Sequence, residues 1–137
     1  MEGTYTDGIH QIPPSERFRE LEGEKSKAIL LANYLKQQHR YVESTEKFAA
    51  AAEIETLLSE ELKNNGQMEP FFIHRFSAAS CWIQAGNLYL AKTMLKEMLR
   101  MANIPEKLAR RIENYLSELE YRTENWLKTF AMPFAAA

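Results

Sequence analysis

Apolar side chains recur at three- and four-residue steps along most of this 137-residue chain. The clearest series lies in the middle of the sequence and consists of Phe48, Ala51, Ala52, Ile54, Leu57, Leu58 and Leu62. Such steps place side chains on one side of an α-helix, whereas a half-buried strand needs strict alternation of apolar and polar residues. No stretch alternates in that way between hairpin turns, and valine and isoleucine are scarce. The sequence therefore predicts an all-α fold.

Turn-forming residues divide the sequence into five predicted helices. Ser15 is a suitable N-cap for the first helix, and Gly66 or Asn65 can end the second in a left-handed conformation. We expect the first helix over about 15–39, the second to end at 63–66, the third to run from about 70 to 86, the fourth to end at 103–105 and the fifth to span about 105–130. The short turns between them favour antiparallel neighbours.

The chain has the length of one domain, and it can bury a core without disulfides or metals. We expect a single helical domain over residues 15–130. The segment before it, 1–14, holds two glycines and two prolines and is expected to be a flexible N-terminal arm. The segment 131–137 is expected to be a loose tail.

Composition and charge argue against several classes of protein. The formal net charge is −2 and the pI is about 6.0, whereas nucleic-acid binders usually have a basic stripe and a pI above about 9. No apolar run approaches the roughly 18 residues that span a bilayer, and the N-terminus lacks the pattern of a signal peptide. The single cysteine, Cys81, excludes an internal disulfide. We therefore expect a soluble cytoplasmic protein with no nucleic-acid or membrane partner.

Residues that could support catalysis or bind a cofactor are scattered along the chain. His10, His39 and His74 lie far apart, and His74 can share a helix face with Cys81 only, which provides too few ligands for zinc. There is no Gly-rich phosphate loop, no H-E-x-x-H and no G-x-S-x-G. We therefore expect a non-enzymatic protein with no catalytic residues, no metal site and no cofactor.

A short turn motif occurs twice, 47 positions apart. The two copies are QQHRYVES at 37–44 and QAGNLYLA at 84–91. Small side chains take matching positions around them, with Ala32 and Ser44 at the first copy and Ala79 and Ala91 at the second. Small residues allow two helices to cross closely, so the repetition indicates two copies of a helix–turn–helix unit.

This pattern resembles the tetratricopeptide repeat, a helical hairpin of about 34 residues. The matching residues are Ala32, Leu35, Tyr41, Ser44, Phe48 and Ala51 in the first unit and Ala79, Trp82, Gly86, Ala91, Leu95 and Met98 in the second. The sequence departs from the family pattern at His39, where glycine is usual, and in the wider spacing of its units. The resemblance implies a right-handed array of helical hairpins over about 25–58 and 72–103, with a capping helix over about 105–130. A generic helical bundle is the alternative.

A tetratricopeptide-like array implies a groove lined by the first helix of each hairpin. The partner-binding residues expected from the resemblance are Ile29, Asn33, Lys36, Gln37, Phe76, Ser80, Ile83 and Gln84. Ile29 stands where members that grip a peptide carboxylate have lysine, so we expect no carboxylate clamp at Asn33. A mixed polar and apolar lining suits a peptide or a helix of another protein, as in an adaptor. A structural bundle, acting as a homodimer or as a subunit of a larger complex, is the second hypothesis, and a ligand-binding or catalytic bundle is the third.

Overall fold

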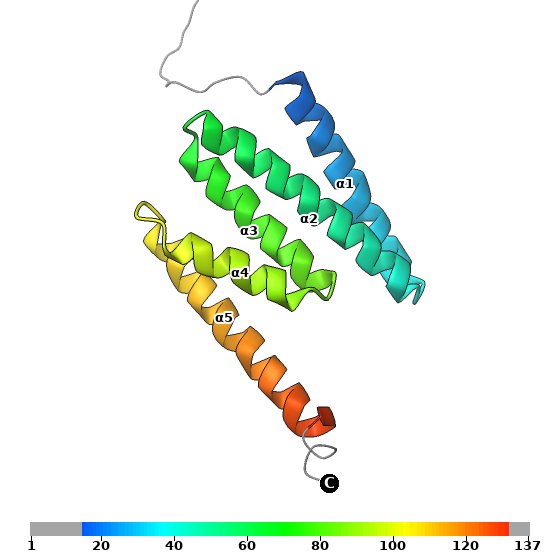
Figure 1. The fold of residues 1–137 in the computed structure, drawn as a ribbon. Coiled ribbons are helices and arrows are strands. Elements are labelled where there is room, and N and C mark those ends of the chain that lie inside the picture. Colours follow the sequence, from blue (N-terminus) through cyan, green and yellow to red (C-terminus); the bar gives the residue numbers. More distant parts are fainter. Residues whose placement is uncertain (1–14, 132–137) are drawn as a thin grey trace, which may run out of the picture. The chain divides into compact units, whose positions relative to one another are not determined.

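The computed structural model describes residues 15–131, so the predicted N-terminal arm at 1–14 and all but the first residue of the predicted tail lie outside the described residues. Between residues 15 and 131 the chain forms five α-helices and no strand (Figure 1). The helices are α1 (Glu16–Gln37), α2 (Tyr41–Asn64), α3 (Met68–Gln84), α4 (Leu88–Leu99) and α5 (Glu106–Trp126), and α5 is followed by a π-helical segment, η2 (Leu127–Ala131). The all-α class and the number of helices are confirmed.

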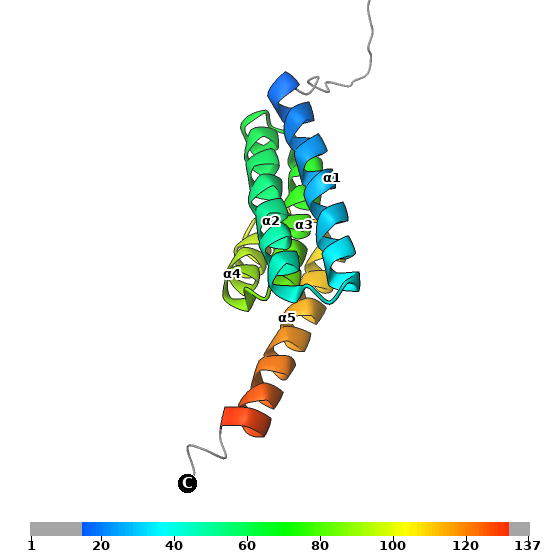
Figure 2. The ribbon, with the colours of Figure 1, turned by 90° about the vertical axis from the view of Figure 1, so that its right-hand side faces the viewer.

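The chain divides into two compact units. Unit 1 is Met1–Asn87 and contains α1, α2 and α3, whereas unit 2 is Leu88–Ala137 and contains α4 and α5. In unit 1, α2 packs against both α1 and α3, and the three helices run alongside one another (Figure 2). In unit 2, α4 packs against α5. The predicted hairpin over 25–58 therefore lies within unit 1, and the one over 72–103 is divided between the two units.

The turns after α1, α2 and α3 share one backbone geometry. A residue with positive φ follows each helix, namely His39 (φ 62°), Gly66 (φ 74°) and Gly86 (φ 82°). The next amide nitrogen donates to the carbonyl oxygen five residues back, as Arg40 does to Leu35, and this distance is 2.9 Å in all three turns. These bonds satisfy carbonyl groups at the helix end in the Schellman arrangement. The structure thus selects Gly66 over Asn65 as the left-handed residue after α2.

The two copies of the predicted turn motif share the left-handed residue and the hydrogen bond that follows it. His39 corresponds to Gly86 in the sequence alignment, and both residues adopt the left-handed conformation. The turn between α2 and α3 has the same geometry at Gly66, although no copy of the motif was predicted there. The left-handed turn is therefore common to three consecutive helix ends and is not limited to the two positions that lie 47 residues apart.

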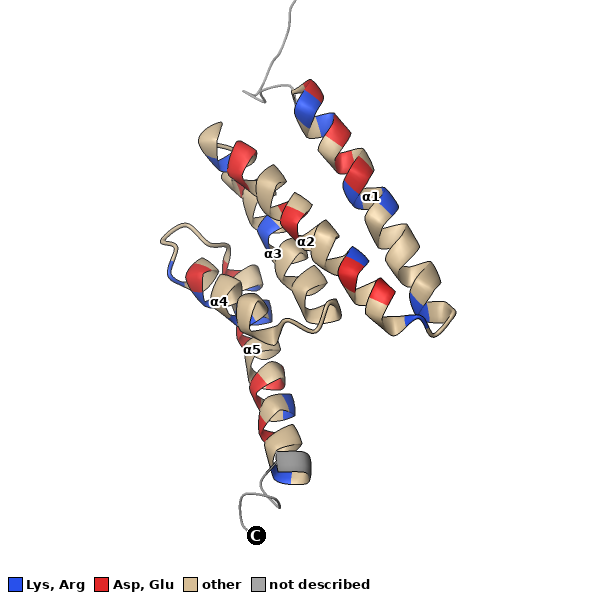
Figure 3. Cartoon of the chain, turned by 45° about the vertical axis from the view of Figure 1, so that its right-hand side comes forward, with Lys and Arg blue, Asp and Glu red and all other residues tan. Residues whose placement is uncertain are grey.

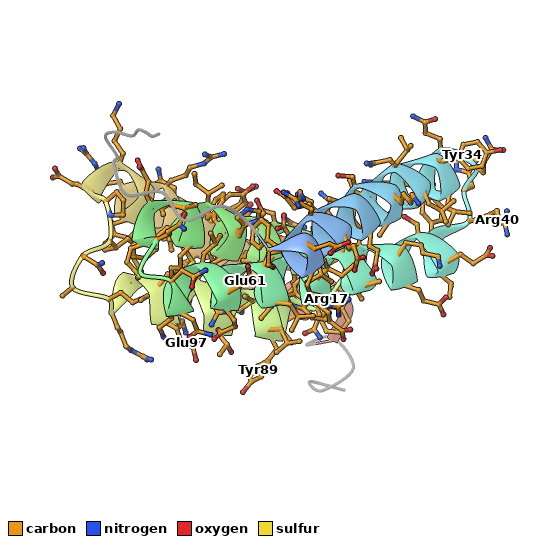
Figure 4. All side chains as sticks on the ribbon, turned by 90° about the horizontal axis from the view of Figure 1, so that it is seen from above. Arg17, Tyr34, Arg40, Glu61, Tyr89 and Glu97 are labelled. Carbon is orange, nitrogen blue, oxygen red and sulfur yellow. The ribbon has the colours of Figure 1, made fainter. Side chains whose placement is uncertain are left out.

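The start of α1 is fixed by Ser15, as the sequence predicts. Its Oγ accepts a hydrogen bond from the amide nitrogen of Phe18 at 2.9 Å, which makes Ser15 the N-cap of the helix. The same hydroxyl donates to the carboxylate of Glu61, at 2.9 and 3.1 Å from its two oxygens. Because Glu61 lies near the end of α2, this bond joins the start of one helix to the end of its antiparallel neighbour. Glu61 is labelled in Figure 4.

Small side chains form the centre of unit 1. Ala51 and Ala52 of α2 are fully buried and form a cluster with Cys81 of α3, which is also buried. Ala28, Ile29 and Trp82 pack against this cluster. At the contact of α1 with α2, the buried Ser44 Oγ donates to the carbonyl oxygen of Ala32 at 2.8 Å. The small pair predicted for the first hairpin therefore lies at a close helix contact, as its size favours. Ala79 and Ala91, the corresponding pair, are both buried and belong to different units.

Unit 2 has a smaller set of buried side chains. On α4 these are Ala91, Met94, Leu95 and Met98, and on α5 they are Ile112 and Leu119. Met94 and Met98 thus fill space in the interior, as expected for flexible apolar side chains. The fifth α-helix ends at Trp126, four residues before the predicted end at Phe130, because the wider π-helical turns of η2 replace the α-helical hydrogen bonds there.

Candidate partner-binding surface

All eight predicted partner-binding residues lie in unit 1, on α1 and α3. The exposed members are Asn33, Lys36, Gln37 and Gln84. The half-buried members are Ile29, Phe76, Ser80 and Ile83. Four polar members of the predicted surface are therefore accessible, whereas Ile29 also packs against the buried cluster of unit 1.

Side-chain contacts connect α1 with α3, although the helix that packs closely against each of them is α2. Lys36 Nζ donates to Gln84 Oε1 at 3.2 Å, which joins the last turns of the two helices. Near their first halves, the rings of Phe18 and His74 meet edge to face with centroids 5.9 Å apart. Ile29 packs against the central cluster between these two contacts. The structure thus brings together at least Lys36 and Gln84 of the predicted set, and α1 and α3 run in the same direction.

A second, apolar surface lies on another side of α1. Leu30, Leu31 and Tyr34 are 74%, 42% and 55% exposed, and we refer to these three residues as the α1 apolar face. Steps of three and four residues bring Leu30 and Leu31 beside Tyr34 on one side of the helix. Tyr41 and Val42 at the start of α2 are also exposed. Exposed apolar side chains thus occur on both sides of the α1–α2 turn. Tyr34 lies near this turn in Figure 4.

The sequence contains a signal for this surface. Residues 28–35 read AILLANYL, which is apolar except for Asn33. A helix with one buried side shows a single apolar stripe, whereas this segment is apolar on two sides. Ala32 and Leu35 are buried and Ile29 packs against the central cluster, whereas Leu30, Leu31 and Tyr34 are exposed. Figure 3 shows the contrast with the first half of α1, which carries many charged residues.

The turn between α1 and α2 is ordered by polar side chains. His39 Nδ1 lies 2.7 Å from Tyr41 Oη. The guanidinium of Arg40 donates to both carboxylate oxygens of Glu43 at 2.6 Å, and this hydrogen bonding holds the pKa of Glu43 below its usual range. Both charged groups are exposed to water, so the pair contributes little to stability.

A buried carboxylate connects the three helices of unit 1. Glu55 on α2 is 3% exposed, and its Oε1 lies 2.6 Å from Nδ1 of His74 on α3. Its other oxygen, Oε2, lies 3.7 Å from Nζ of Lys25 on α1. A buried carboxylate is stable only with such partners, so these contacts favour one mutual arrangement of the helices.

Glu55 and Cys81 are both buried in unit 1. Glu55 lies within the apolar series of α2, one turn after Ala51 and Ala52, and an acidic residue at core spacing is the signal that could have identified it. Burial raises the pKa of the Cys81 thiol to about 11, and the negative charge of Glu55 adds to this effect. The thiol is therefore neutral near pH 7 and a poor nucleophile.

The chain matches no known family model, no curated protein and no solved structure. None of the helices between residues 15 and 131 combines the length and the apolar character needed to cross a membrane. In the same part of the chain, no three His, Cys, Asp or Glu side chains gather in a way that could hold a metal ion. The function has to be inferred from the residues and contacts of this chain.

Proposed function

We propose that the protein is a non-enzymatic interaction module, or adaptor, that presents a helical surface of unit 1 to a peptide or a helix of another protein. The observation that supports this function is the α1 apolar face, where Leu30 is 74% and Tyr34 is 55% exposed. Single exposed apolar residues are ordinary, but several large ones on one side of a helix are typical of interaction sites. Their burial against a partner would remove apolar area from water and so favour association.

The α1 apolar face is continuous with part of the surface expected from the sequence. Asn33 and Gln37 are exposed and follow Leu30 at steps of three and seven residues, so they lie beside Leu30 and Tyr34. Exposed amide side chains around apolar ones are typical of a protein interface, which has an apolar centre and a polar rim. The bond between Lys36 and Gln84 extends this rim from α1 to α3.

The function is tested by affinity capture from the native host with the full chain and with a Leu30→Ser/Tyr34→Ser variant. We expect at least one protein to be recovered by the wild type and lost with the variant, because the variant removes the apolar centre of the proposed interface. Both side chains are largely exposed, so the change in the free energy of unfolding should be small, within about 0.5 kcal/mol for each site. Urea unfolding checks that expectation.

Leu57→Ser is the matched control, because Leu57 is exposed on α2 and lies outside the proposed surface. It should recover the same protein as the wild type. Equal recovery by the wild type and the double variant would contradict the proposed surface. A homodimer that forms with rising concentration in light scattering, and that the double variant dissociates, would support the second hypothesis, a self-associating structural protein.

A further inference from the structure

We draw no further inference here: the strongest candidate, the exposed α1 apolar face of unit 1 with Lys27 beside it, carries nothing beyond the proposed function because nothing in the structure shows what covers it.

Discussion

At the scale of single residues, the end of α1 depends on an unusual backbone conformation at His39. Its φ of 62° lies in the left-handed region, which costs a residue with a Cβ atom about 1–2 kcal/mol. The contact of His39 Nδ1 with Tyr41 Oη at 2.7 Å is exposed and offsets only a part of this cost. Gly86 holds the equivalent position after α3 and has no Cβ atom to strain.

We expect His39→Gly to raise the free energy of unfolding by about 1 kcal/mol, because it removes the backbone strain. Gly86→Ala should lower it by about 1 kcal/mol. A Cβ atom at Gly86 would meet nothing within 4 Å, so the loss comes from the backbone and not from a clash. Urea unfolding of the full chain measures both changes.

Gly23 provides the control for this pair of variants. It lies within α1, and a Cβ atom there would also meet nothing within 4 Å. Gly23→Ala should therefore stabilise the protein by about 0.5–1 kcal/mol through helix propensity. An unchanged stability of Gly86→Ala would show that the turn after α3 does not depend on its left-handed residue.

At the scale of helices, the arrangement of α1, α2 and α3 depends on Glu55. Its two carboxylate oxygens face His74 and Lys25, which belong to the two helices that pack against α2. We expect Glu55→Ala to lower the free energy of unfolding by about 3 kcal/mol, because it leaves both partners without a carboxylate. Glu55→Gln keeps an acceptor for His74 and should cost less. Thermal unfolding checks this order.

Glu53→Ala is the control for Glu55→Ala, because Glu53 is exposed on the same helix. Its effect should lie within about 0.5 kcal/mol. Similar stabilities of the two alanine variants would mean that the buried carboxylate does not hold the helices together.

The helices themselves could be predicted well, but not all of their limits. Ser15 and Gly86 provide strong signals for a helix start and a helix end, and both act as expected. The first residue of α2 could not be located from the sequence as clearly. Arg40, its N-cap residue, forms no capping hydrogen bond with its side chain, so the local sequence does not mark Tyr41 as the first helical residue. The turn that ends α1 places this start instead.

At the scale of the whole molecule, the two units differ in how many helices stabilise each other. In unit 1, α2 packs against two helices, whereas α5 in unit 2 has only Ile112 and Leu119 fully buried. Beyond Leu119, the side chains of Tyr121, Trp126 and Leu127 are exposed. The free energy of local opening should therefore differ along the chain.

We expect hydrogen exchange to show this difference. Amides in the middle of α2, around Ala51 and Leu58, should exchange about a hundredfold more slowly than amides at 120–126, the factor that about 2.7 kcal/mol of opening free energy produces. Mass spectrometry of peptic fragments measures both segments in one experiment. Equal protection of the two segments would show that the chain opens as one cooperative unit.

The sequence by itself determined the helical class, the number of helices and the ends of α2 and α3 near Gly66 and Gly86, because periodicity, caps and left-handed turns act within a few residues. It also placed Asn33 and Gln37 among the exposed polar residues of α1. It did not determine the ends of α4 and α5, which stop at Leu99 and Trp126, before the predicted ends at 103–105 and about 130. Only the tertiary structure decided which of the two apolar sides of α1 is buried. The sequence of α1 shows that Leu30 and Leu35 are both apolar, but whether either side chain contacts another helix depends on residues far along the chain. The same reason applies to Glu55, whose partners lie on two other helices and become visible only when the three helices pack together.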